Sequence, residues 1–215
     1  MNRRMVKGTI ALFLFSWVSA HAQFGIGADV VSRYIWRGSD FGNTAAVQPY
    51  LSYSNGPVEI GAWSSWSINP APGGYENDLY LTLSARQFSV TVTDYYFPKI
   101  DAGQDNFFKF GDNAGIHFLE TTAAVEQGAF SAFGGVFFSG DDENSLYLEG
   151  SYQAYSKDDI SASVFLAGGN GIYSLDTDFS LVNLGLTVSK GIFSASYILN
   201  PNREITFLVF GASFR

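Results

Sequence analysis

Residues 79–86 read LYLTLSAR, with an apolar side chain at every second position. Because successive side chains of a β-strand point to opposite faces, this period of two predicts a strand with one apolar face and one polar face. A short turn at Arg86-Gln87 comes next, and residues 88–93, FSVTVT, begin the alternation again. The stretch therefore predicts a β-hairpin.

The same hairpin pattern recurs along the chain, and no stretch shows a convincing helical face. A similar three-residue motif follows four of the expected short turns: Phe88-Ser89-Val90, Phe130-Ser131-Ala132, Ile160-Ser161-Ala162 and Phe193-Ser194-Ala195. The short turns are expected at 55–57, 86–87, 127–128, 156–159 and 190–191. This spacing indicates a quasi-repeat on the scale of one hairpin.

Longer polar connections alternate with these short turns, at 38–43, 69–76, 98–114, 140–144, 168–177 and 200–204. The segments between them predict twelve strands: 24–37, 44–54, 58–68, 77–86, 88–97, 115–126, 129–139, 145–155, 160–167, 179–189, 192–199 and 205–214. Most are close to the 9–11 residues that a tilted strand needs to cross a bilayer.

The composition narrows the class of protein. The 215 residues include no cysteine and carry a net charge of -8, which excludes disulfide scaffolds and thiolate sites and argues against a nucleic-acid partner. Charged residues make up 15% and hydrophobic residues 47%, whereas roughly 25% charged is typical of soluble domains. We therefore expect apolar side chains on the outside of the molecule.

The first residues have the pattern of an export signal. Arg3, Arg4 and Lys7 precede an apolar run over 9–20, which is too short for a membrane-spanning helix of about 20 residues. Ala20-His21-Ala22 then offers small residues around a cleavage point. We expect a cleaved signal peptide over 1–22 and a barrel over 23–215; the alternative is an N-terminal membrane anchor.

Together these features predict an all-β fold: a closed antiparallel up-and-down transmembrane β-barrel of twelve strands. A soluble sandwich with an aromatic core is the alternative. In the barrel, a single register directs the charged side chains of the strands into the lumen. Asp94 is an exception, because it falls outward near a strand end, where we expect a bulge or exposure at the interface. Pro49 indicates a bulge or kink in its strand. The residues predicted to line a pore are Asp29, Arg33, Arg37, Glu59, Asp78, Arg86, Glu120 and Glu149.

Aromatic side chains are expected outward near both ends of the barrel, as interfacial girdles. The girdle at the short-turn end comprises Phe88, Phe130, Phe193 and Phe214, and the girdle at the loop end comprises Tyr34, Trp36, Trp66 and Tyr197. Ile26, Ala28 and Val30 are expected outward on the first strand.

Residues 29–38, DVVSRYIWRG, resemble the opening motif of the TorF-type porin family of proteobacterial outer-membrane barrels. Further fragments are similar and follow in order: 46–48 with Tyr53, 61–65, 95–98 and 147–152. The resemblance implies an outer-membrane location and a channel role, without a defined substrate. The end of the chain also resembles the sorting signal read by the barrel-assembly machinery: Phe214 closes an alternation, although Arg215 follows it.

The function that the sequence favours is a small porin. It would pass small hydrophilic solutes without a cofactor or metal, lie in the bacterial outer membrane against lipid and lipopolysaccharide, and have both termini in the periplasm. Basic and acidic groups facing across a pore select solutes by charge, and the acidic excess predicts a weak cation preference. The competing interpretation is a structural ion-pair network that fills the lumen of a non-conducting surface barrel.

The long connection over 98–114 holds Phe107, Phe108, Lys109 and Phe110, which could fold inward as a constriction or rest on the outer lipid interface. A lipid-modifying enzyme is a weaker alternative, with His117 as its candidate base. No serine precedes or follows His117 on the same face of its strand, so we expect no enzymatic activity. The acidic run at 141–143 is interpreted as a solvated loop, and divalent-cation binding is the alternative. The glycine-rich run at 168–171 lacks the lysine of a phosphate loop.

Overall fold

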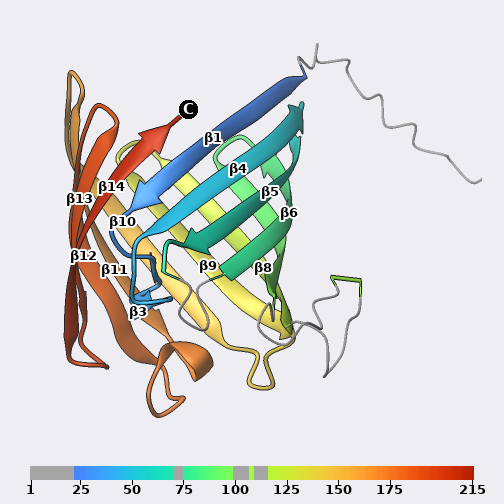
Figure 1. The fold of residues 1–215 in the computed structure, drawn as a ribbon, viewed down its shortest axis with the longest axis vertical. Coiled ribbons are helices and arrows are strands. Elements are labelled where there is room, and N and C mark those ends of the chain that lie inside the picture. The colour runs from blue at the N-terminus through green and yellow to red at the C-terminus, as the bar shows by residue number, and fades with distance from the viewer. Residues whose placement is uncertain (1–21, 70–74, 99–106, 109–115) are drawn as a thin grey trace, which may run out of the picture.

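The computed structural model describes residues 22–69, 75–98, 107–108 and 116–215, and these form a closed β-barrel (Figure 1). Twelve antiparallel strands make the wall, each paired with its neighbour in sequence, which confirms the predicted fold class. The strands are β1 (Gln23–Val31), β4 (Ala46–Asn55), β5 (Val58–Ser67), β6 (Tyr75–Ala85), β7 (Phe88–Phe97), β8 (Ile116–Gln127), β9 (Phe130–Ser139), β10 (Leu146–Lys157), β11 (Ile160–Gly169), β12 (Ser180–Lys190), β13 (Phe193–Asn200) and β14 (Ile205–Phe214).

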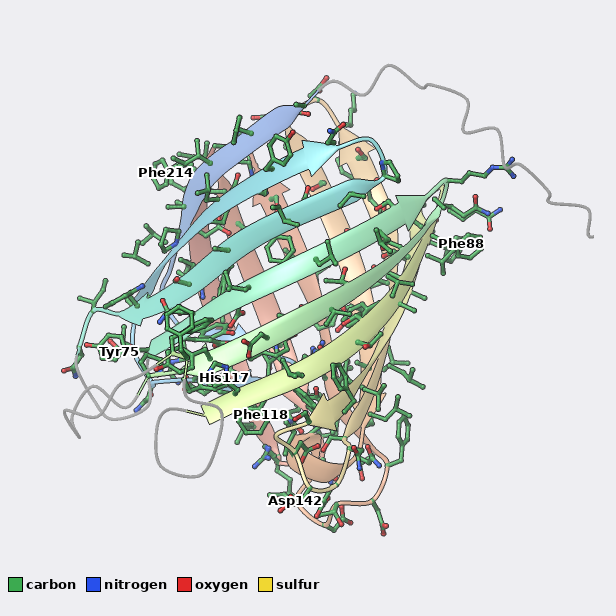
Figure 2. The ribbon with its side chains drawn as sticks, turned by 90° about the vertical axis from the view of Figure 1, so that its right-hand side faces the viewer. Tyr75, Phe88, His117, Phe118, Asp142 and Phe214 are labelled. Carbon is green, nitrogen blue, oxygen red and sulfur yellow. The ribbon has the colours of Figure 1, made fainter. Side chains whose placement is uncertain are left out.

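The five expected short turns all join neighbouring strands at one end of the barrel, which we call the turn end. Each contains a residue with a positive φ: Gly56, Arg86, Gly128, Asp158 and Gly191. Tight hairpin turns need this left-handed backbone because it matches the twist of the flanking strands. The longer connections lie at the opposite end, the loop end. In Figure 2, Phe88 lies at the turn end and Asp142 at the loop end.

The outer face of the barrel is apolar. Leu79, Leu81 and Leu83 of β6 are 43–53% exposed, and their in-register neighbours on β7 include Val92 and Val90. The four girdle phenylalanines at the turn end are also outward and more than half exposed, at 51–64%. The alternation therefore places apolar side chains outside and polar ones inside, as expected. Among the described residues, no helix has the length and apolar character needed to cross a membrane.

The first strand ends earlier than expected. The alternation predicted one strand over 24–37, but β1 stops at Val31, and residues 35–40 form a second, smaller hairpin of β2 (Ile35–Trp36) and β3 (Ser39–Asp40). Figure 1 shows this segment inside the ring of strands. The backbone of Ser32 still donates to the Phe210 carbonyl at 2.8 Å, and beyond that residue the chain leaves the wall.

This change of path reverses two expected orientations. Tyr34 is 9% exposed and its ring lies 5.6 Å from that of Trp63, while Trp36 packs against the buried lumen cluster. Both were expected on the outer girdle, and that expectation is wrong. Trp66 and Tyr197 do lie outward, at 46% and 54% exposure. The alternation of residues 24–36 is real, but a strand pattern cannot distinguish the wall from a hairpin inside it.

The barrel closes through a short seam between its first and last strands. The register of β1 and β14 runs over four pairs, from Ala28–Phe214 to Val31–Gly211, whereas β11 and β12 share ten. The backbone amide of Phe210 adds a 2.9 Å hydrogen bond to the Ser32 hydroxyl. The first part of β1 therefore extends past the end of β14, so the wall is staggered there. Both described chain ends, Ala22 and Arg215, lie at the turn end (Figure 1).

Two other expectations concern the chain ends and the strand interruptions. The expected signal segment 1–22 lies outside the described residues except for Ala22. Pro49 lies in β4, where the register with β5 passes from Val47–Trp66 to Tyr50–Trp63 without an intervening pair. A proline lacks the N–H that a ladder needs, so a local gap in pairing is its expected effect.

Candidate functional site

The β2–β3 hairpin places one guanidinium at the centre of the loop-end lumen. Its two-residue turn is Arg37-Gly38, with φ of 49° and 82°, the left-handed pair that a type I′ turn requires. At Gly38 a side chain is impossible, because a Cβ would lie 2.2 Å from the Val182 carbonyl oxygen. The fully buried Asn200 donates from Nδ2 to the Gly38 carbonyl at 3.0 Å and so ties the hairpin tip to the end of β13.

Arg37 forms a buried, bidentate ion pair with Glu120 on β8. Its Nη1 and Nη2 donate to the two carboxylate oxygens at 2.6 and 2.9 Å, and the side chains are 9% and 0% exposed. Two parallel charge-assisted bonds fix the geometry as well as the charge. Burial alone would lower the pKa of Arg37, but the hydrogen bond to Glu120 outweighs it and raises the pKa above its ordinary value. The guanidinium is therefore a permanent cation.

Aromatic rings surround this cation. The Cζ atom of Arg37 lies 4.6 Å from the ring centre of Trp36 and 4.7 Å from that of Tyr147, with Tyr173 and Phe133 at 5.5 and 5.6 Å. Arg37 Nη1 also donates to the hydroxyl of Tyr173. Tyr173 belongs to a 3-10 turn, η2 (Gly171–Tyr173), in the connection after β11. Cation–π contacts strengthen when water is excluded, as it is here.

Glu120 is held from three further sides. The hydroxyls of Tyr95 and Thr122 donate to its Oε2 at 2.8 and 3.3 Å. On β9, Gly135 leaves the room that the carboxylate occupies, since a Cβ there would lie 2.3 Å from Glu120 Oε1. The carboxylate is therefore held by residues of the wall as well as by Arg37.

The buried hydrophobic cluster of the barrel lies around this ion pair, not in a separate core. Phe137, Tyr147, Ala167, Tyr173 and Val182 are at most 2% exposed and face the lumen. We call these residues, with Trp36, Arg37 and Glu120, the plug. The plug lies in the loop-end half of the lumen.

The turn-end half of the lumen has a different lining. It carries hydroxyl side chains that bond in pairs across neighbouring strands: Thr82–Thr91 at 2.9 Å, Ser131–Ser151 at 2.6 Å and Thr187–Ser196 at 2.8 Å. Glu59 belongs to this half and accepts hydrogen bonds from Ser54 and Tyr80 at 2.8 and 3.1 Å. The turn-end half of the lumen is thus lined by polar side chains, and the loop-end half holds the aromatic plug.

The remaining inward carboxylates do not meet a basic partner among the described residues. Asp78 is 6% exposed and lies on the same face of β6 as Glu76, which is 4% exposed. Burial and these two carboxylates raise the pKa of the Tyr34 hydroxyl. Glu149 accepts a 2.6 Å hydrogen bond from Tyr147, and Oδ1 of Asp29 has no described partner.

Two other predicted pore-lining arginines do not belong to the plug. Arg33 is on the segment after β1, where it pairs with Asp40 at 3.1 Å and is 39% exposed. Arg86 was expected at the inward end of a strand, but it occupies the exposed turn between β6 and β7, with a φ of 55°. The predicted strand was one residue too long there, so Arg86 does not line the lumen.

The expected constriction loop is described only at Phe107 and Phe108; Lys109 and Phe110 lie outside the described residues. Phe107 packs against the outward pair Tyr96 and His117, with ring centres 5.1 and 5.3 Å apart, and Phe108 is 87% exposed. These two phenylalanines therefore lie on the outside of the barrel, whereas the β2–β3 hairpin lies inside the ring of strands.

His117 is on the outer face of β8, near the loop end (Figure 2). Its Nδ1 lies 2.8 Å from Oδ1 of Asp94, and its Nε2 lies 3.0 Å from the Phe107 carbonyl oxygen. Asp94 does fall outward as expected, and this contact explains why a carboxylate is tolerated there. A general base needs a free lone pair, whereas both ring nitrogens here face oxygen atoms.

Within the described residues, no group of three or more histidine and carboxylate side chains is arranged to hold a metal ion. In the acidic run 141–143, Asp141 accepts a hydrogen bond from the backbone N–H of Ser145 at 2.6 Å, as loop-stabilising aspartates do.

Comparison with known proteins found no matching family model, no matching curated protein and no matching solved structure.

Sequence reasoning identified both charges of the central ion pair but not the rings around it. Arg37 and Glu120 were expected to face each other across a pore, and they are in direct contact. Trp36 was assigned to the outer face, and Tyr173 to a flexible loop. The Arg37-Gly38 dipeptide was the available signal, because a glycine at the second turn position favours a two-residue hairpin.

Proposed function

We propose that this chain is an outer-membrane barrel with both termini in the periplasm. The closed wall supports the proposal, because a barrel satisfies every strand amide without water. The apolar outer face supports it as well, since large exposed apolar surfaces mark contact with lipid or protein. The resemblance of residues 29–38 to the TorF-type porins points in the same direction. The expected contacts of Phe214 with the assembly machinery belong to this proposal.

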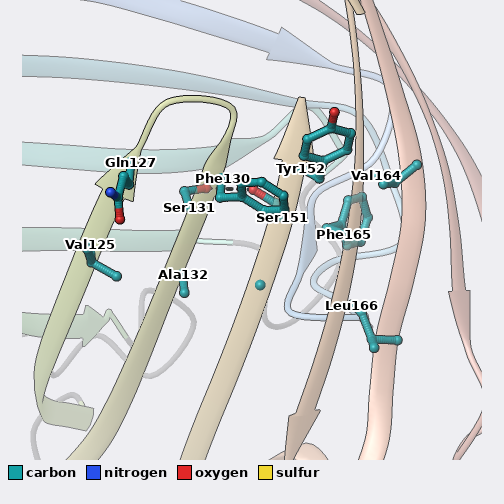
Figure 3. Close-up of a pocket in the computed structure, with 11 residues that line it drawn as sticks. Val125, Gln127, Phe130, Ser131, Ala132, Ser151, Tyr152, Val164, Phe165 and Leu166 are labelled. Carbon is teal, nitrogen blue, oxygen red and sulfur yellow. Dashed lines mark hydrogen bonds between the residues drawn. The ribbon is translucent and has the colours of Figure 1, made fainter. Parts of the chain in front are cut away.

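Outer-membrane lipid is the proposed partner of the outer face. Figure 3 shows a hollow on that face, over β8 to β11. Its outward wall is apolar and its centre is Gly150, where no atom lies within 4 Å of the position that a Cβ would take. Phe130 and Tyr152 close it toward the turn end, with ring centres 4.7 Å apart. A hollow with this lining accepts an acyl chain of lipid or lipopolysaccharide.

Within the membrane, we propose a gated, porin-like channel for small hydrophilic solutes. The observation that carries this proposal is the contrast between the two halves of the lumen: polar side chains line the turn end, and the plug lies at the loop end. Polar groups along the lumen suit a path for hydrophilic solutes. The β2–β3 hairpin is the movable element, because it belongs to a connection and not to the wall.

The ion pair between Arg37 and Glu120 holds the proposed gate in its closed position. If the hairpin leaves that position, the two buried charges separate, and separation of such a pair costs about 3–5 kcal/mol. An open state at that free energy is populated less than about 1% of the time. We therefore expect rare openings, not steady conductance.

Single-channel recording in planar bilayers tests the gated channel. We expect the wild-type protein to be closed for most of the record with brief openings, and Arg37→Met to be open far more often. The control is Arg33→Met, which removes an arginine from the exposed pair of the same connection. A wild-type record that is steadily open contradicts the plug. No openings in either protein would favour the non-conducting structural barrel, which the buried cluster would also suit.

A further inference from the structure

A second cavity lies beside the plug, on the other side of Trp36 from the cluster around Arg37. Its volume is about 220 Å³. A cavity of about 150 Å³ is enough to hold benzene, so this one can take a ligand of several heavy atoms. We call it the cage. The described residues that line it are Trp36, Phe41, Glu76, Tyr95, Phe97, Phe118, Phe137 and Ile172.

The six aromatic residues of the cage form a closed ring of contacts. Around the ring, the distances between ring centres are 5.7 Å for Trp36–Phe41, 6.2 Å for Phe41–Phe97, 5.9 Å for Phe97–Phe118, 5.8 Å for Phe118–Phe137, 5.9 Å for Phe137–Tyr95 and 5.8 Å for Tyr95–Trp36. Four elements contribute: the β2–β3 segment, β7, β8 and β9. Such a ring presents several π faces and edges to whatever occupies its centre.

Among the described residues that line this aromatic cavity, one has a carboxyl group. Glu76 is 4% exposed and shares a hydrogen bond with the Tyr34 side chain, but its Oε2 is buried with no hydrogen-bond partner in the described part of the chain. A buried carboxyl oxygen without a partner is costly, and a bound cation would offset that cost. The arginine of the plug, Arg37, is already committed to Glu120 through both carboxylate oxygens. Glu76 therefore presents a carboxyl oxygen that the plug leaves without a partner, beside six rings.

We propose that the cage binds a small organic cation with an apolar body, such as a quaternary ammonium group. The rings would contact the alkyl groups around the positive charge, and Glu76 would balance that charge. Quaternary ammonium ions suit this lining because they need no hydrogen-bond acceptors and interact favourably with aromatic faces. The cage is separate from the ion pair that sets the gate, so the proposal goes beyond the channel function and does not require conduction.

Calorimetric titration of the full-length protein in an uncharged maltoside detergent tests the cage. The probe is choline, and its uncharged carbon analogue 3,3-dimethylbutan-1-ol has the same shape. We expect choline to bind at least about tenfold more tightly than the alcohol. Equal affinities, or no choline binding, would overturn the proposal, because either result leaves the charge unrecognised.

Three variants assign the binding to the cage. Glu76→Gln keeps the size but removes the charge, and we expect it to weaken choline binding at least about tenfold without changing alcohol binding. Phe97→Leu keeps an apolar wall but removes one ring, so choline binding should fall more than alcohol binding. Asp142→Asn removes an exposed charge at the same end of the barrel and should change neither. Near-ultraviolet circular dichroism confirms that each variant is folded; a folded Glu76→Gln protein that binds choline normally would refute the assignment.

Discussion

Arg37 adopts a backbone conformation that side chains other than glycine seldom take, and its buried contacts explain why it is stable there. A left-handed residue of this kind costs of the order of 1–2 kcal/mol. The bidentate pair with Glu120 and the surrounding rings offset that strain. The same contacts make the residue hard to replace, because its removal leaves a carboxylate buried without a partner.

Arg37→Met should therefore lower the free energy of unfolding by about 3–5 kcal/mol. Chemical unfolding of the protein in lipid vesicles, followed by tryptophan fluorescence, measures this change. Arg33→Met is the matched control, since the Arg33–Asp40 pair is partly exposed and such pairs contribute only about 0–1 kcal/mol. The double variant Arg37→Met with Glu120→Leu should recover most of the loss. Equal effects for the two single variants would contradict the plug.

A substitution at Gly135 tests the position of the Glu120 carboxylate, whereas the Arg37 variant tests the cation. A methyl group at Gly135 would lie 2.3 Å from Glu120 Oε1, so Gly135→Ala must displace Glu120 and loosen the ion pair. We expect a destabilisation of about 1–3 kcal/mol, as for other overpacked sites. Gly150→Ala is the control, because nothing lies within 4 Å of its Cβ position. If both alanine variants unfold at the same denaturant concentration, Glu120 is not held as described.

At the scale of elements, the proposed gate is the β2–β3 hairpin. Gly38→Ala should prevent its docking, because a Cβ would lie 2.2 Å from the Val182 carbonyl at a φ of +82°. We expect a higher open probability in planar bilayers than for wild type. Gly128→Ala is matched in backbone strain, with a φ of +62° and open space around its Cβ, and should leave gating unchanged. Identical gating in the two variants would exclude the hairpin as the gate.

The elements of the wall follow from local patterns, whereas the hairpin inside it does not. Strand alternation and turn residues act over a few positions, so all twelve wall strands and five short turns were predicted from sequence. The position of residues 35–40 depends on contacts made far along the chain: Glu120 is 83 and Tyr173 is 136 residues from Arg37. A period of two cannot report such distant partners, which is why the first strand was predicted too long. The cage was missed for the same reason.

For the whole molecule, the distribution of charge predicts ion selectivity. Among the described residues, the strand carboxylates on the inward face include Asp29, Glu59, Glu76, Asp78, Glu120 and Glu149, and Arg37 pairs with Glu120. Because a pore lined by acidic groups favours cations, we expect the reversal potential in a potassium chloride gradient to show cation preference. Glu59→Gln in the polar half should reduce that preference. An anion-selective wild-type record would contradict the charge argument.

The short seam between β1 and β14 has a consequence for biogenesis. Closure joins the first strand of the barrel to the last, so a nascent or truncated chain cannot form a smaller ring; it presents two open sheet edges that invite aggregation. Every contact that completes the wall must wait for the final residues, and long-range pairing of this kind is slow. We therefore expect the chain to need protection of these edges until its C-terminal strand is available to complete the four-pair seam.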